Sequence, residues 1–155
     1  MNDFKANFQK AIEERLSKDG KMHISKTDKE DVWNEFIWIE TNDKQIGHLD
    51  CHYELICKDQ PKFGHSNNHI HVEVHFENDD TCKYFNKLKQ FEGFHIIKRW
   101  KSIGIRMNEK GHCIDNISMD DLVNEVIDDL YKTDKIIGDA IRKIIKENGI
   151  CNDKD

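Results

Sequence analysis

The chain of 155 residues has little of what marks a linker or a disordered segment. It contains one proline, eight glycines and no low-complexity tract. Its length is that of one ordinary domain with a single hydrophobic core. We therefore expect one domain over residues 1–150, followed by a polar tail over residues 151–155.

The sequence also lacks the marks of membrane insertion, secretion and disulfide bonding. No apolar run approaches the roughly 18–20 residues that span a bilayer. The first five residues do not resemble the charged start of a signal peptide. The five cysteines are widely spaced and contain no Cys-x-x-Cys pair, unlike a disulfide framework or a zinc ribbon. These absences predict a cytoplasmic protein with no membrane contact.

Familiar catalytic motifs are missing as well. The sequence has no phosphate-binding glycine-rich loop, no G-x-S-x-G elbow and no H-E-x-x-H helix. Two cysteine–histidine neighbours occur, Cys51-His52 and His112-Cys113, but neighbours on a strand point to opposite faces. The sequence therefore favours a non-catalytic protein without an organic cofactor, and leaves open a divalent metal.

What is present begins with three consecutive strand patterns. The clearest covers residues 69–77, where apolar and polar side chains alternate with period two. Residues 32–40 and 45–58 are also rich in strand-forming side chains. Because short turns link the three segments, we expect an antiparallel meander.

Helical patterns flank these strands. Apolar residues recur every four positions over 3–18, and residues 21–30 are polar and expected to be irregular. A second helix is expected from a cap at 78–80 to Gly93, then strands over 94–107, broken near 102–104, and 112–114. A long final helix begins at its N-cap Ser118, and Gly138 is a place where it can bend.

The predicted order is therefore α-β-β-β-α-β-(β)-α. This order describes an α+β fold with an antiparallel sheet of about four to five strands. The helices lie mainly on one face of that sheet, and the C-terminal helix is long.

A histidine-rich sheet face is the one chemical cluster. If the second and third strands pair, their polar side chains share one face, at separations of about 5 Å between facing neighbours. Imidazole and carboxylate groups at that separation can hold zinc or another divalent ion. The alternative is an ordinary solvated polar face. The candidate ligands are His52, His69, His71, Glu73 and His75.

A basic segment contrasts with the net charge of −6. Residues 83–110 contain eight Lys or Arg against two Asp or Glu, interleaved with aromatic residues. Such a segment can contact nucleic acid, although it is equally consistent with solvated lysines over a core. The candidate nucleic-acid contacts are Lys98, Arg99, Lys101 and Arg106.

The first strand pattern has apolar residues on both faces, so one face needs a cover. Either a second layer of this chain or a partner could provide it. The candidate partner-binding residues are Trp33, Phe36 and Trp38. The broad apolar stripe of the final helix further suggests pairing with a second copy, as a homodimer.

The chain from His69 onward carries a strand over 71–77, a short acidic-capped helix, the run Trp100–Ile105 and a final helix over 120–145. In this it resembles the C-terminal accessory domain of some bacterial PD-(D/E)XK-type nucleases. No strand ends in the acid-x-lysine arrangement of the nuclease centre, so the resemblance implies a recognition or assembly module. The element order is also similar to that of type III secretion chaperones, which are small, acidic, dimeric proteins that bind an extended partner segment.

The leading hypothesis is thus a non-catalytic protein-binding or assembly module of a bacterial cytoplasmic system. Two alternatives stay open. One is a nucleic-acid-associated accessory domain that uses the basic segment, and the other is a divalent-metal-binding protein that uses the histidine-rich face.

Overall fold

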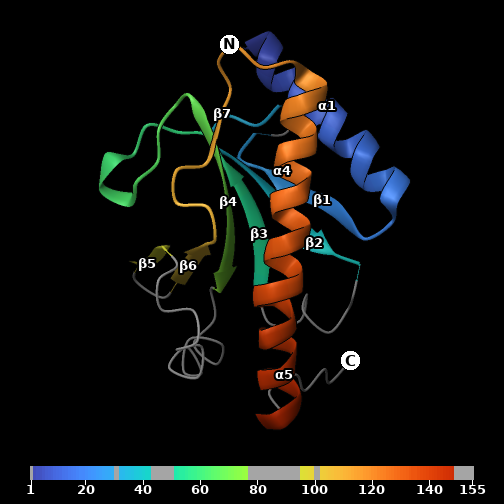
Figure 1. The fold of residues 1–155 in the computed structure, drawn as a ribbon, viewed down its shortest axis with the longest axis vertical. Helices are drawn as coiled ribbons and strands as arrows, with labels where there is room; N and C mark the ends of the chain where they lie inside the picture. The colour runs from blue at the N-terminus through green and yellow to red at the C-terminus, as the bar shows by residue number, and fades with distance from the viewer. Residues whose placement is uncertain (1, 30–31, 43–50, 77–94, 100–101, 149–155) are drawn as a thin grey trace.

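The structure, a computed structural model, describes residues 2–29, 32–42, 51–76, 95–99 and 102–148. The described residues form an α+β fold with an antiparallel sheet, as predicted (Figure 1). The sheet order is β1-β2-β3-β4-β6-β5, and β7 pairs with the start of β4. The strands are β1 (Met22–Thr27), β2 (Phe36–Thr41), β3 (Cys51–Ile56), β4 (His69–Phe76), β5 (His95–Arg99), β6 (Ser102–Arg106) and β7 (His112–Cys113).

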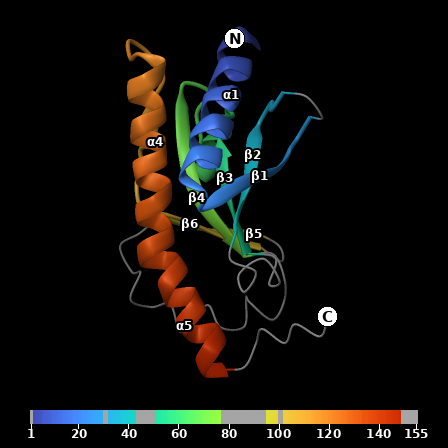
Figure 2. The same cartoon turned by 90° about the vertical axis from the view of Figure 1, so that its right-hand side faces the viewer.

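Two long helical segments cover one face of the sheet. The first is α1 (Asn2–Asp19), and the second runs through α4 (Met119–Thr133), the π-helical turn η3 (Asp134–Gly138) and α5 (Asp139–Asn148). Both α1 and α4 lie on the same side of the strands (Figures 1 and 2). None of the described helices is long and apolar enough to cross a membrane.

The hydrophobic core lies between these helices and the sheet. Alternate residues of β2, β3 and β4 face it, so that Ile37 pairs with Leu55 and Tyr53 pairs with Val74. The apolar stripe of α1 supplies Phe8 and two further core residues, because a four-residue spacing keeps side chains on one helix face. The expected helix over 3–18 is confirmed, and so is the meander of β2, β3 and β4.

The start of the C-terminal helix also follows the sequence. The Ser118 side chain accepts a hydrogen bond from the backbone N–H of Asp121 at 3.1 Å, which confirms the predicted cap. The helix is interrupted where Gly138 suggested a bend, by the π-helical turn η3. A Cβ at position 138 would lie 2.6 Å from Asp134 Oδ1 and 2.8 Å from the Tyr53 hydroxyl, so glycine lets the helix approach β3 closely.

Other expectations need correction. Residues 21–30 were expected to be irregular, but Met22–Thr27 forms β1, whose Met22 side chain is buried. The polar run gave no strand signal because β1 lies at the edge of the sheet, with β2 as its one partner among the described strands. The strand expected over 32–40 begins only at Phe36. The strand character expected over 94–107 is confirmed by β5 and β6, but residues 102–104, where a break was expected, belong to β6. The helix expected after residues 78–80 lies outside the described residues.

Candidate metal centre

The face of the sheet opposite the helices carries buried polar side chains. The pairing of β3 with β4 sets His52 opposite His75 and Glu54 opposite Glu73. Because side chains alternate along a strand, all four point away from the hydrophobic core. Their exposed fractions are 1%, 1%, 7% and 0%, respectively. The predicted histidine-rich face therefore exists, but it is an interior and not a solvated surface.

Three of these side chains converge on one point. We call His52, Glu54 and His75 the Glu54 cluster. A nitrogen of each histidine and a Glu54 oxygen all lie within 4.8 Å of one another. Glu54 Oε2 lies 2.6 Å from His52 Nε2 and 3.2 Å from His75 Nδ1. Two imidazoles and a carboxylate form a donor set that zinc and ferrous iron use in proteins.

His75 is held between two carboxylates. Its Nε2 lies 2.8 Å from Glu73 Oε1, while its Nδ1 faces Glu54 Oε2. A neutral imidazole has a single N–H, so it can donate to only one of the two carboxylates. If Nε2 donates to Glu73, the lone pair of Nδ1 points at an ionised oxygen. A positive charge beside Nδ1, such as a metal ion, would make that contact favourable.

Glu73 has further partners on its other oxygen. Its Oε2 lies 2.5 Å from His65 Nε2 and 3.1 Å from Arg106 Nε. Arg106, which is fully buried, also places Nη1 at 2.7 Å from His71 Nδ1. We call His65, His71 and Glu73 the Glu73 cluster. It lies beside the Glu54 cluster and is joined to it through the contact between Glu73 and His75.

Both carboxylates are ionised in this surrounding. Burial alone would raise the pKa of Glu73, but hydrogen bonds with His65 and His75 outweigh it and hold the pKa well below its usual value. Burial also acts against Glu54, whose pKa is nevertheless lowered by the hydrogen bond with His52 and the neighbouring His75. Burial, followed by the charge of Arg106, lowers the pKa of His71 to about 3. Among the described residues, the two carboxylates therefore face one permanent positive charge, that of Arg106.

The surroundings of the Glu54 cluster include one side chain from the predicted partner surface. The ring of Trp38 stacks on His52 with 3.3 Å between ring centroids, and Lys26 Nζ lies 4.1 Å from the Trp38 ring on β2. Trp38 is half-buried, as is Phe36. Trp33 is 1% exposed and donates its indole N–H to Lys5 O at 2.8 Å, so it is a core residue. The expectation that Trp33 faces a partner does not fit this position.

Of the four predicted nucleic-acid residues, the one whose side chain is described, Arg106, is buried. Arg106 points into the sheet face and donates to the backbone oxygens of Phe63, Gly64 and Glu109. It is therefore not available to a phosphate group, and this correction follows from its burial. Lys98 and Arg99 lie on β5, and Lys101 lies outside the described residues.

Four of the five ligands predicted from the sequence lie in the two clusters, and two further cluster residues were not predicted. His52 and His75 are in the Glu54 cluster, and His71 and Glu73 are in the Glu73 cluster. His69 is half-buried at the start of β4, where Nδ1 contacts Ser66 and Asn68 instead. Glu54 lies on the predicted face but was not among the five candidate ligands. His65 comes from the loop between β3 and β4, so strand periodicity could not place it.

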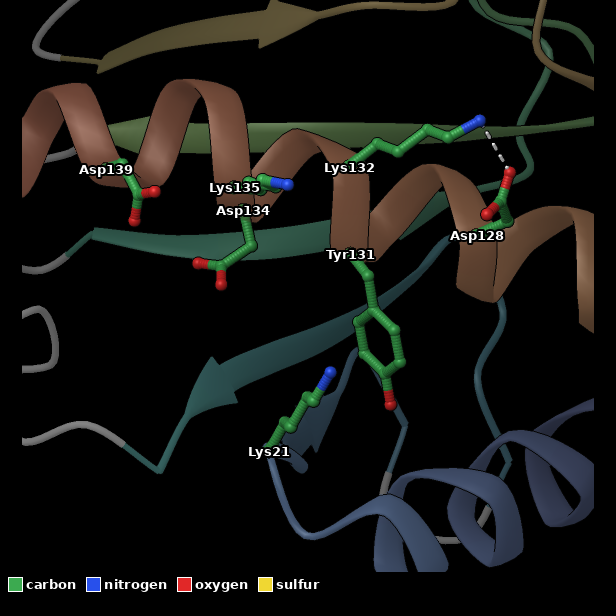
Figure 3. Close-up of a pocket in the computed structure, with 7 residues that line it drawn as sticks. All are labelled: Lys21, Asp128, Tyr131, Lys132, Asp134, Lys135 and Asp139. Carbon is green, nitrogen blue, oxygen red and sulfur yellow. Dashed lines mark ion pairs between the residues drawn. The ribbon is translucent and has the colours of Figure 1, made fainter.

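A surface pocket lies elsewhere, between the C-terminal helices and the turn after α1. Figure 3 shows its lining, and its volume is about 400 Å³. Lys132 pairs with Asp128 at 2.9 Å, and Lys21 Nζ lies 4.8 Å from the Tyr131 ring. The lining is open to solvent, and most of its charged side chains contact another residue of the chain. The Glu54 cluster is the stronger candidate site.

Comparisons with protein-family models, with curated proteins and with solved structures find no match for this chain.

Proposed function

We propose that this protein binds one divalent transition-metal ion, of the zinc, ferrous iron or manganese class, in the Glu54 cluster. The ligands would be His52 Nε2, a Glu54 carboxylate oxygen and His75 Nδ1. The observation that carries the proposal is the position of His75 between two carboxylates. A metal ion between Nδ1 and Glu54 would satisfy a contact for which the neutral ring has no proton.

Two further features support a metal ion here. With a metal ion on Nδ1, Nε2 of His75 would carry the proton and donate to Glu73 Oε1, which lies 2.8 Å away. Such an outer contact orients metal-bound histidines and makes them better ligands. The donors are nitrogen and oxygen only, with no sulfur, which favours these ions over copper(I). Three protein ligands leave at least one coordination position for water or a small molecule.

Cobalt(II), which substitutes for such ions and has visible absorption bands, is the probe of choice. Titration of chelator-treated protein is expected to give one equivalent and the bands of a low-symmetry site. Zinc at about 100 times its Kd should stabilise the fold by about 2.7 kcal/mol, measured by urea unfolding.

Variants identify the ligands. His75→Gln and Glu54→Gln should weaken binding by more than about 100-fold, beyond the usual effect of an outer contact. His69→Gln is the matched control, because His69 is on the same strand and outside both clusters, and it should bind as the wild type does. If wild-type protein takes up no cobalt and unfolds at the same urea concentration with zinc or chelator, the proposal fails.

A protein-binding module or homodimer, and an accessory domain for nucleic acid, stay predictions from the sequence. Each of these two functions has fewer candidate contact residues than the sequence suggested, because Trp33 and Arg106 are both buried.

A further inference from the structure

The two clusters on this sheet face have the same composition, but they differ in the positively charged group beside the carboxylate. Each consists of one glutamate and two histidines, and the contact between His75 and Glu73 joins them. In the Glu54 cluster no side chain of the described residues that carries a permanent positive charge contacts the carboxylate. In the Glu73 cluster the guanidinium of Arg106 does so.

The guanidinium occupies the donor atoms that a metal ion would need. Its Nε lies 3.1 Å from Glu73 Oε2, and its Nη1 lies 2.7 Å from His71 Nδ1. The nitrogen of His71 that faces Nη1 must accept, because arginine only donates. One carboxylate oxygen and one imidazole lone pair of the cluster are therefore already directed at a positive charge.

Arg106 is also fixed in place by the backbone. Nη1 donates to Gly64 O at 3.2 Å and to Glu109 O at 3.1 Å, and Nη2 donates to Phe63 O at 2.7 Å. These carbonyls come from the loop before β4 and from the turn after β6. A guanidinium that is fully buried and held at this many points cannot move aside for an incoming ion without breaking these hydrogen bonds.

We propose that Arg106 is a specificity-determining residue that serves as the built-in cation of the Glu73 cluster and limits this face to a single metal ion. The same contact helps to fix the position of the Glu73 carboxylate, whose other oxygen contacts His75 Nε2 and can orient that ring toward the Glu54 cluster. The statement that this face holds a single metal ion rests on the proposed metal site. That Arg106 keeps metal out of the Glu73 cluster is tested independently.

The experiment compares metal stoichiometry in wild-type protein and Arg106→Gln, by equilibrium dialysis against zinc followed by elemental analysis. Glutamine is neutral and frees Glu73 Oε2 and His71 Nδ1, so the variant should bind one equivalent more than the wild type does. The difference between the two proteins is the test. Wild-type protein without metal would overturn the proposed function, while a gain of one equivalent in the variant would still support the role of Arg106. An equal stoichiometry in folded variant and wild type overturns that role.

Arg106→Gln removes three hydrogen bonds that Arg106 donates to backbone oxygens, and can therefore unfold the protein. The substitution His71→Gln, made in the presence of Arg106, keeps the proposal falsifiable in that event. This variant should retain the single equivalent and the cobalt spectrum of the wild type, because Arg106 excludes His71 from metal binding. A loss of metal or a changed spectrum in a folded His71→Gln variant would mean that the Glu73 cluster supplies a ligand, and would overturn the proposal.

Discussion

At the scale of single residues, the buried polar face depends on a glycine, Gly111, in the turn before β7. Gly111, between β6 and β7, has a φ of +77°, and a Cβ there would lie 2.7 Å from the His71 ring. That ring in turn contacts Arg106. A side chain at position 111 would therefore have two effects: it would strain the backbone, and it would clash with the His71 ring of the Glu73 cluster.

Gly111→Ala is predicted to be more destabilising than Gly20→Ala. Gly20 has nearly the same φ, +73°, but a Cβ there meets no atom within 4 Å. Gly20→Ala should cost about 1–2 kcal/mol for the left-handed backbone alone. Gly111→Ala should add about 1–3 kcal/mol for overpacking against His71. Urea unfolding of the two variants measures the difference, and equal losses would mean that the ring moves aside freely.

At the scale of elements, the π-helical turn η3 fits the C-terminal helix onto β3. The Tyr53 hydroxyl donates to Asp134 Oδ1 at 2.7 Å, and Arg142 Nη2 donates to the same oxygen at 2.7 Å. Gly138 lies over this contact. π-helical turns often mark a site where an extra residue is accommodated for a close approach.

Gly138→Ala should destabilise the protein, although glycine to alanine in a helix ordinarily stabilises by about 1 kcal/mol. The reason is that the new Cβ would displace Asp134 and the Tyr53 hydroxyl. In a Tyr53→Phe background Asp134 is freer to move, so the cost of Gly138→Ala should fall by at least about 0.5 kcal/mol. Thermal or urea unfolding of both single variants and the double variant gives this coupling. Additive losses would refute it.

The comparison of sequence and structure is clearest at this scale. Strand periodicity predicted β2, β3 and β4, and with them the shared face of His52, His71, Glu73 and His75, because alternation is a local property. The Ser118 cap and the interruption near Gly138 are local as well. His65 and Arg106 could not be placed on this face, since they reach it through a loop and through the pairing of β6 with β4. The edge strand β1 lacked a signal because its polar side chains face solvent.

At the scale of the whole molecule, a histidine outside both clusters, His112, joins the sheet to the long helix. His112 on β7 places Nε2 at 2.7 Å from Asp129 and Nδ1 at 3.2 Å from Glu125, both on α4. Asp129 also accepts from Thr133 at 3.2 Å. Burial alone would lower the pKa of His112, but the hydrogen bonds with Asp129 and Glu125 outweigh it and raise the pKa.

This contact predicts a pH dependence of the free energy of unfolding. Because the pKa of His112 is higher in the folded state than the ordinary 6.5, its contribution is fully present below about pH 6.5. The contribution is lost as pH rises through the raised pKa, by about 1.4 kcal/mol for each unit of elevation. The difference in unfolding free energy between wild type and His112→Gln should therefore shrink between pH 6 and pH 9, values chosen to lie roughly on either side of that range. A constant difference would show that His112 does not titrate in this window.

β3 has all six residues buried, with hydrocarbon on one side and imidazole and carboxylate groups on the other. The strand therefore separates two buried regions. One is held by apolar packing, and the other by contacts between charged and polar side chains. Heating and urea act chiefly through the apolar side, whereas acid acts through the ionised side. When the interactions on one side of β3 are weakened, those on the other side still keep the strand in the sheet. The backbone amides of β3 should accordingly be among the last to exchange with deuterated water under either condition.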